Sequence, residues 1–475
     1  MKTKTKIISI LLISALIPFI WGCGLRKKPA AQVEPLEMWG VWDDSDVIQN
    51  FISQYKEQNE HIKDIKYRKF TYDEYENELI KALAAGRGPD IFQVHHSWLA
   101  RYQDLMLSLE QAQEIYNQAA SEKSGCDKPP LIEEPLLTER QYKEAFVDVA
   151  HDDFVKNQQI YGIPLTIDTL ALFYNQDLFS GAGIPLPPGT WEDFEKDVRL
   201  LTQKDQYNTI TQSGAAIGAA SNVNRAGDIL ALMMMQLGCP MTDPENFSSQ
   251  ITQRTTRPED SGQSQLYTPA QQALDFYSSF ANGQNPNYTW NSSLHNSVDS
   301  FQEGRVAMLL NYTYAYSTIK SKAPKLNFKI TPAPQFQGAT SQNKIAYANY
   351  WGYAVSKKSA QIKNKPVEAW KFLLFLGAKE QVQGYADKTQ RPASRRDVLA
   401  EQKKQPDMGV FADQALIAKS WYQPNEGQID QIFNQNIQAV YLGQKTTEQA
   451  IQEINAKIDI LMQENEAKNK ELETE

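Results

Sequence analysis

Cysteine, clustered positive charge and long apolar runs are all scarce in this sequence. Three cysteines in 475 residues are too few for a disulfide-rich scaffold, and Cys126 and Cys239 lack the ligand spacing of a zinc site. Whether these two cysteines pair with each other in an oxidising compartment stays open. The net charge is −9, and no large Lys/Arg cluster follows the N-terminus. This argues against nucleic acid as a partner, and we expect neither a metal nor a cofactor.

Signatures of common enzyme sites are also absent. We find no Gly-x-Ser-x-Gly elbow, no His-Glu-x-x-His pair, no phosphate loop and no Gly-x-Gly-x-x-Gly turn. The run from His151 to Asp153 would suggest a metal, and Asp43 with Asp44 would suggest a glycosidase pair. Carboxylates are common, however, and a sequence does not give their separation in space. We therefore expect that the protein is not an enzyme. Two alternative functions stay open: a secreted carbohydrate-active hydrolase, and a surface lipoprotein without a role in transport.

The N-terminus predicts export across a membrane. Three lysines precede the uncharged apolar run from Ile7 to Ile20, which is too short for a comfortable membrane span and typical of a secretory signal. The run ends at Gly22-Cys23, which resembles a bacterial lipoprotein processing box. We predict a signal peptide at 1–22, lipidation of Cys23, and a lipidated tether over 23–35, whose small polar residues favour flexibility. The protein would then be anchored to the cell membrane and face away from the cytoplasm.

Hydrophobic periodicity predicts an α/β fold. A chain of 475 residues is too long for one compact core, so we expect more than one lobe. The pattern predicts strands at 36–42, 65–70, 91–94 and 170–174, and helices at about 72–85, 229–237, 368–376 and 447–469. It also predicts a helix with an apolar stripe from Val47 to Tyr55, and a helix that starts after Thr190. Strands that alternate with helices indicate βαβ units and a largely parallel sheet.

Several segments in a shared order resemble a known family. The matching segments are Leu83–Phe92, Tyr161–Leu165, Leu172–Phe179, Thr190–Phe194, Phe301–Met308, Trp351–Lys357 and Glu368–Leu373. They resemble the extracellular solute-binding proteins of family 1, the maltose-binding-like substrate-binding lipoproteins of ABC transporters. The likeness extends over roughly residues 36–460. It is specific for the family and the fold, and it leaves the ligand undetermined.

The resemblance implies a two-lobed protein of the type II periplasmic-binding-protein-like fold. Its two α/β lobes would be joined by a hinge, with a ligand cleft between them. Lobe 1 would hold residues 36–166 and 350–391, and lobe 2 would hold 167–349 and 392–475. The implied function is capture of a polar small molecule, by default an oligosaccharide, and its delivery to the permease subunits of an ABC importer. We expect a monomer.

Three candidate ligand residues follow the ends of predicted strands. A sugar presents hydroxyl groups and apolar ring faces, so its site needs hydrogen-bonding side chains and aromatic rings. Trp42 and Asp43 follow the first strand, and His96 follows the strand that ends at Val94. The carboxyl ends of strands are where α/β sheets bind ligands. The alternatives are that Asp43 only caps a helix and that His96 is a solvated histidine.

Five further candidates come from the segments between the lobes and from the second lobe. Asp168 matches an acidic hinge-side position of the family, Tyr314 matches a stacking tryptophan, and Asp430 lies in another ligand-facing region. Trp351 lies where the chain should cross between lobes, so its ring is a candidate for stacking. Asn224 precedes a buried helix, where its amide would either bind hydroxyls or cap a loop. The maltose-type carboxylate expected near residue 97 is absent, which argues against a maltose-like ligand.

Overall fold

The computed structural model describes residues 34–60, 62–123, 130–258, 264–340, 343–362 and 364–474. The predicted signal peptide, Cys23 and most of the tether lie outside the described residues, and so does Cys126. Cys239 is a free thiol inside the fold, where burial raises its pKa to about 11. Within the described ranges, no helix has the length and apolar character needed to cross a membrane.

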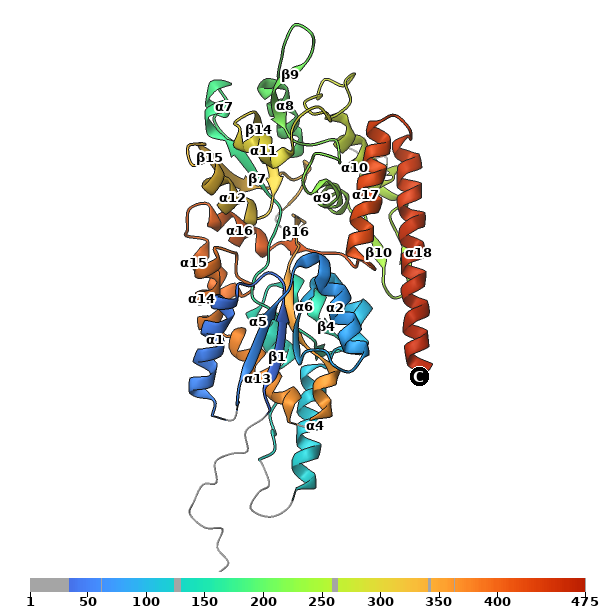
Figure 1. Ribbon diagram of the computed structural model, residues 1–475. Coiled ribbons are helices and arrows are strands. Elements are labelled where there is room, and N and C mark those ends of the chain that lie inside the picture. Colours follow the sequence, from blue (N-terminus) through green and yellow to red (C-terminus); the bar gives the residue numbers. More distant parts are fainter. Residues whose placement is uncertain are drawn as a thin grey trace, which may run out of the picture.

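The first lobe is built on a five-stranded sheet (Figure 1). Its strands, in spatial order, are β2 (Ile65–Lys69), β1 (Leu36–Gly40), β3 (Ile91–His95), β17 (Trp351–Val355) and β6 (Ile163–Pro164). Helices α1 (Ser45–Gln58) and α2 (Tyr72–Ala84) connect the parallel strands β1, β2 and β3. The apolar stripe of α1 from Val47 to Tyr55 is buried, as an amphipathic helix on a sheet requires.

Further helices complete the first lobe: α3 (Leu99–Tyr102), α4 (Leu109–Glu122), α5 (Glu139–Ala145), α6 (Asp148–Phe154), α13 (Lys365–Leu376), α14 (Lys379–Thr389) and α15 (Arg396–Gln402). The predicted helix at 368–376 is confirmed as the C-terminal part of α13. The Trp370 side chain of α13 is fully buried, and its indole N–H donates to the carbonyl of Leu107 at 3.1 Å. This hydrogen bond satisfies the one polar group of an otherwise apolar ring.

The second lobe has its own five-stranded sheet. Its spatial order is β15 (Phe328–Pro332), β7 (Ala171–Asn175), β14 (Val306–Asn311), β9 (Ile210–Ala215) and β8 (Gln203–Lys204). The helices are α7 (Gln176–Gly181), α8 (Trp191–Leu201), α9 (Ala226–Gln236), α10 (Pro269–Ser279), α11 (Ser297–Gln302), α12 (Tyr314–Lys322), α16 (Met408–Ala415), α17 (Glu426–Tyr441) and α18 (Thr447–Thr474). Short pairs of strands lie outside the sheets: β4 (Val155–Lys156) with β5 (Gln159–Ile160), β10 (Thr242–Asp243) with β11 (Ser248–Ser249), and β12 (Thr255–Pro258) with β13 (Ser264–Tyr267).

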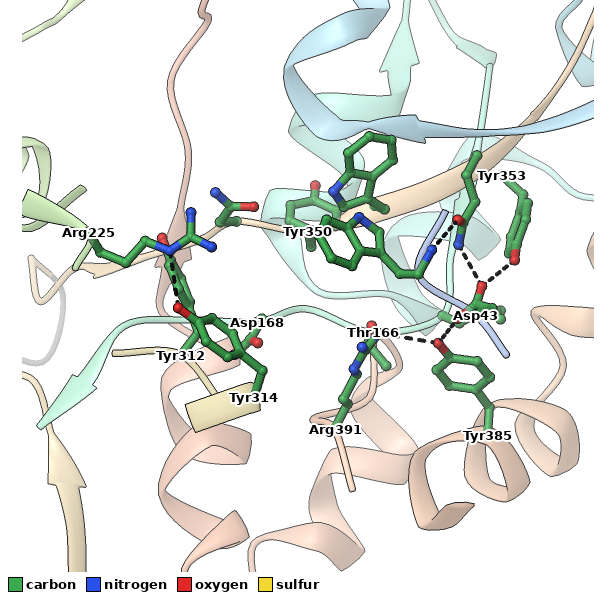
Figure 2. A pocket seen from close by; sticks show the side chains of 15 residues that line it. Asp43, Thr166, Asp168, Arg225, Tyr312, Tyr314, Tyr350, Tyr353, Tyr385 and Arg391 are labelled. Atoms are coloured by element: carbon green, nitrogen blue, oxygen red, sulfur yellow. Dashed lines mark hydrogen bonds between the residues drawn. The ribbon is translucent and has the colours of Figure 1, made fainter. Parts of the chain in front are cut away.

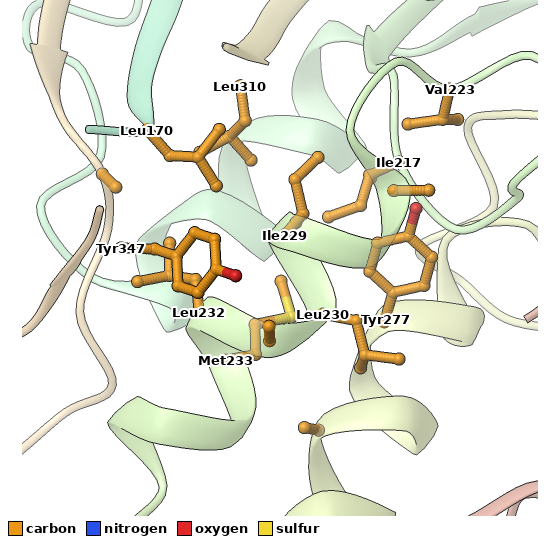
Figure 3. Packing of buried hydrophobic residues seen from close by; sticks show 14 of the residues in the cluster. Leu170, Ile217, Val223, Ile229, Leu230, Leu232, Met233, Tyr277, Leu310 and Tyr347 are labelled. Atoms are coloured by element: carbon orange, nitrogen blue, oxygen red, sulfur yellow. The ribbon is translucent and has the colours of Figure 1, made fainter. Parts of the chain in front are cut away.

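Helix α9 forms the centre of the second hydrophobic core (Figure 3). The sequence predicts this helix as buried on nearly all sides, and the structure confirms it, because every residue from Ile229 to Met235 is buried. The apolar stripe of α18, which includes Ile451 and Ile458, is buried in the same core. The last helix thus packs on its own lobe alongside α17 (Figure 1).

Both sheets are mixed, whereas the sequence predicts largely parallel ones. Strand β17 is antiparallel to β3, and β7 is antiparallel to both β14 and β15. Strands β17 and β7 follow the segments that cross from one lobe to the other, so each enters its sheet at the cleft. The βαβ strands end at that same edge, and the two kinds of strand therefore run in opposite directions.

The lobes are joined by extended segments that lie side by side. Thr169 and Ala348 form an antiparallel bridge, and β16 (Ala346–Tyr347) pairs in parallel with β18 (Ala418–Lys419). Val398 and Leu399 come after the predicted return to lobe 2 at residue 392, and both are buried in the first core. These two side chains belong to α15, which packs against α5 and α14 of the first lobe and also against α16. The lobe boundaries stay a prediction.

Candidate ligand-binding cleft

A cavity of about 390 Å³ lies between the two lobes (Figure 2). The residues that line it are Trp42, Asp43, Gln93, Leu165, Thr166, Asp168, Arg225, Tyr312, Tyr314, Asn349, Tyr350, Trp351, Tyr353, Tyr385 and Arg391. They come from β1, β3, β17 and α14 of the first lobe or the residues just after them, from the segments that cross between the lobes, and from the second lobe near α9 and α12. Five of the eight residues predicted from the sequence are among them: Trp42, Asp43, Asp168, Tyr314 and Trp351.

Aromatic rings form one wall of the cavity. The ring of Trp42 is 41% exposed, and its centroid lies 6.2 Å from that of Trp351 at an angle of 68°. Behind Trp351 lie Trp98, with centroids 5.1 Å apart, and His95, with centroids 5.4 Å apart. Trp351 is thus held in a fixed orientation by its neighbours, while Trp42 stays partly exposed to solvent.

The carboxylate of Asp43 is used by the protein itself. It accepts hydrogen bonds from Gln93 Nε2 at 2.5 Å and from the hydroxyls of Tyr353 and Tyr385, and the residue is only 3% exposed. It does not cap α1, whose N-cap residue is Asp44. Asp43 therefore fixes the two tyrosine rings that line the cavity floor, because a buried carboxylate must be hydrogen-bonded.

Asp168 lies on the first crossing segment and holds the second lobe to it. Its Oδ1 accepts from the backbone N–H groups of Thr169 and Thr313 at 2.9 and 3.1 Å, and its Oδ2 accepts from the Thr313 hydroxyl at 2.6 Å. Burial raises the pKa of Asp168, against the effect of these hydrogen bonds and of the Arg391 charge. Asp168 is therefore a paired, buried acid at the hinge edge of the cavity.

Arg225 and Tyr314 form the wall on the second lobe. Arg225 stands at the N-cap of α9 in the left-handed region, with φ 63°, a conformation that costs a non-glycine residue about 1 kcal/mol or more. Its Nε donates to the Tyr314 hydroxyl at 3.3 Å, and that hydroxyl donates to Asn224 Oδ1 at 2.8 Å. Asn224 lies outside the cavity lining and orients Tyr314 from behind.

Arg391 is a cavity residue that sequence reasoning missed. Among the described residues, its guanidinium group makes one long contact, from Nη1 to the Tyr385 hydroxyl at 3.5 Å. The side chain lines the cavity (Figure 2), where its other N–H groups are available as donors. Burial lowers the pKa of Arg391, but the neighbouring Tyr385, Asp43 and Asp168 together raise it, and the pKa lies above its ordinary value. No local pattern marks this arginine, because it follows α14 and reaches the cleft only through the tertiary fold.

Besides Asn224, two of the predicted site residues, His96 and Asp430, lie outside the cavity lining. His96 is 3% exposed and stacks on Tyr350, with centroids 5.0 Å apart, so it is a packed residue and not a solvated one. Its Nδ1 lies 3.3 Å from a carboxylate oxygen of Asp153 without hydrogen-bond geometry. Asp430 lines a smaller recess of about 40 Å³ beside the cavity. A strand end suggested His96 and the family resemblance suggested Asp430, but neither kind of reasoning gives the direction of a side chain.

The charges on the cavity wall balance. Two carboxylates, Asp43 and Asp168, face two guanidinium groups, Arg225 and Arg391. The same lining lacks any arrangement of an activated serine or cysteine nucleophile, and in the described part of the chain no three His, Cys, Asp or Glu side chains converge as metal ligands would. The lining of the cavity therefore suits a ligand that makes many hydrogen bonds and also presents apolar faces.

Two α/β lobes around a hinge, with a polar and aromatic cavity between them, define the class of two-lobed binding proteins. The chain belongs to the bacterial extracellular solute-binding protein family, whose model matches residues 42–383. It is 24% identical over 344 residues to a putative binding protein of Brucella abortus (strain 2308), covering 70% of this chain and 75% of the relative. It is also 27% identical over 225 residues to the arabinooligosaccharide-binding protein of Bacillus subtilis (strain 168), covering 45% of this chain and 46% of the relative.

Solved structures agree on the fold. The sugar-binding protein MalE from Xanthomonas citri superposes with a TM-score of 0.70 at 17% identity, over 92% of this chain and 99% of that protein. At this identity the likeness concerns the fold alone. The predicted type II periplasmic-binding-protein-like fold is thus confirmed, and the chain is a solute-binding protein of an extracellular family.

Proposed function

We propose that this protein captures an oligosaccharide in the cleft between its lobes and delivers it to the permease of an ABC importer. The observation that carries the proposal is the cavity of about 390 Å³, lined from both lobes by aromatic rings and hydrogen-bonding groups. Trp42, Trp351 and Tyr314 offer ring faces to the apolar faces of sugars. Arg225 and Arg391 offer N–H donors to hydroxyls. The relatives whose names include a sugar support the same ligand class.

A ligand that touches both lobes would favour the closed cleft. Open and closed states of such proteins differ by little free energy, so contacts available only in the closed state shift the population. We propose that the importer recognises the closed shape, and that Cys23 carries a lipid that keeps the protein at the membrane.

The alternatives are weaker. A hydrolase needs a carboxylic acid and a carboxylate free to act on the glycosidic bond, whereas Asp43 and Asp168 each accept three hydrogen bonds from the protein. A scaffolding lipoprotein has no use for an arginine held in a strained backbone conformation at a cavity. We therefore propose a binder that does not catalyse a reaction.

A thermal-shift screen tests the proposal. The purified protein is heated with oligosaccharides built from glucose, arabinose or mannose, and with amino acids and peptides as the other solute class. At a concentration 100 times Kd a ligand adds about 2.7 kcal/mol to the free energy of unfolding, which raises Tm by about 5 °C for lobes of this size. Stabilisation by a peptide alone, or release of free sugar from a stabilising glycoside, would contradict the proposal.

A further inference from the structure

The guanidinium group of Arg391 lies at the cavity without a carboxylate partner. The side chain is partly buried, and its contact within the described residues is the long one to the Tyr385 hydroxyl at 3.5 Å. The next arginine along the chain, Arg395, is also partly buried, and it pairs with Asp397 at 2.9 Å. Charged side chains that are withdrawn from water are usually paired in this way. The charge and the N–H groups of Arg391 are therefore available to a ligand.

The two carboxylates of the cavity lining have little capacity left to bind a ligand. A carboxylate has about four lone-pair sites for hydrogen bonds. Asp43 already accepts three hydrogen bonds from side chains of the first lobe, and Asp168 accepts three from Thr169 and Thr313. Both acids lie near Arg391, but the two guanidinium groups of the lining balance their charges. A negative group on a ligand therefore meets no net negative charge in this lining.

The lining offers more hydrogen-bond donors than acceptors. Asn349 Oδ1 lies 3.2 Å from His95 Nε2, and the amide N–H groups of Asn349 make no hydrogen bond within the described part of the chain, so they add to the donors of Arg391. A sugar hydroxyl brings one hydrogen with each oxygen, whereas a carboxylate only accepts. A wall of donors leaves the hydrogens of buried hydroxyls unsatisfied, which is unfavourable. A ligand with a carboxylate matches this wall better than a ligand with hydroxyls alone.

The second arginine of the cavity is less suited to hold a negative group. Arg225 Nη1 lies 4.0 Å from a carboxylate oxygen of Asp228. Arg225 also lines the small recess beside the cavity, together with Glu426 at the start of α17 and Asp430 one turn later. These acids offset the charge of Arg225 and repel a further negative group. Arg391 does not line that recess, so a ligand carboxylate is expected at Arg391.

We propose that the oligosaccharide bound in the cleft is an acidic one, and that Arg391 binds the carboxylate of a uronic acid unit. The planar guanidinium fork matches the two oxygens of a carboxylate, and the side chain lines the same cavity as the aromatic wall (Figure 2). Trp42 and Trp351 would then contact the ring faces of the same sugar. This inference rests on the proposed function and adds the class of oligosaccharide.

Pairs of disaccharides that differ only in their carboxyl groups test the inference. Digalacturonate, dimannuronate and diglucuronate are each compared with the neutral disaccharide of the same linkage, by isothermal titration calorimetry with the purified protein. In at least one pair the acidic member should bind with a Kd about 10-fold or more below that of the neutral member. Equal affinities in all three pairs, or tighter binding of the neutral members, would overturn the inference.

Variants at Arg391 locate the carboxylate. Arg391→Gln keeps an amide donor and loses the charge, so it should raise the Kd of the acidic disaccharide about 10- to 100-fold and change that of a neutral one far less. Arg391→Lys keeps the charge without the fork and should lose less affinity than Arg391→Gln. Arg140→Gln is the matched control, because Arg140 is 87% exposed on α5 and does not line the cavity. It should keep the wild-type Kd.

Two further results would overturn the inference: a ratio of acidic to neutral affinity that Arg391→Gln leaves unchanged, or a hexose phosphate that binds more tightly than every uronate. If neutral disaccharides bind and acidic ones do not, the oligosaccharide proposal stands and this inference fails. If no saccharide of either kind binds, the oligosaccharide proposal is refuted, and the inference that rests on it is refuted too.

Discussion

Replacing Trp42 with alanine should weaken ligand binding with little effect on the fold. An aromatic side chain presents about 150–250 Å² of surface, and 41% of Trp42 is exposed at the cavity, so a ligand can cover up to about 100 Å² of it. At about 25 cal/mol per Å² the lost contact is worth up to about 2.5 kcal/mol. Because one ligand covers only part of this area, we expect Kd to rise about 10- to 50-fold.

Isothermal titration calorimetry with the oligosaccharide that gives the largest thermal shift measures this change. Tyr207→Ala is the matched control, because Tyr207 is 79% exposed between β8 and β9 and does not line the cavity. The control should keep the wild-type Kd, and both variants should melt within a few degrees of the wild type. A Kd for Trp42→Ala within about twofold of the wild type would refute the stacking role assigned to this ring.

Two further predictions concern stability. Trp351→Ala should abolish binding. It should also lower the free energy of unfolding by about 3 kcal/mol, because the ring packs on Trp98 and His95. A urea titration that gives the variant the wild-type free energy of unfolding would contradict this. Asp197→Asn should stabilise the protein by about 1 kcal/mol at pH 7 and not near pH 4. Burial and the neighbouring Asp193 raise the pKa of Asp197 to about 6, so the protonated carboxyl favours the fold below the ordinary value of 3.8, and that contribution is lost as the pH rises through about 6. Equal stabilisation by Asp197→Asn at both pH values, in urea titrations, would show that ionisation is not the cause.

Local patterns predicted the secondary structure closely where one face or all faces of an element are apolar. Strands β2 and β3 and helix α2 begin where the periodicity places them, since burial of an apolar stripe is written directly into residue spacing. The same patterns could not give the direction of β17 or β7. That direction depends on the path of the chain between lobes, and no short segment contains it.

The same limit explains which candidate site residues were predicted correctly as cavity residues and which were not. Trp42 and Asp43 could be found because strand ends in α/β sheets converge on a common edge. His96 lies at such an end too, yet it packs on Tyr350 and not in the cavity. One residue along a strand reverses the side on which a side chain lies, so position at a strand end does not by itself predict exposure to the cavity.

The sequence by itself determined that the chain alternates strands and helices and that its N-terminus resembles an export signal. It also determined membership of the extracellular solute-binding family, through several motifs that occur in the family's order along the chain. Only the tertiary structure decided which charged groups face the cleft, because Arg225, Arg391 and Glu426 are brought together from positions far apart in the chain. Hydrophobic periodicity is a local property that a linear sequence carries, whereas the pKa of a buried carboxyl depends on every charge and every solvent-excluding atom around it.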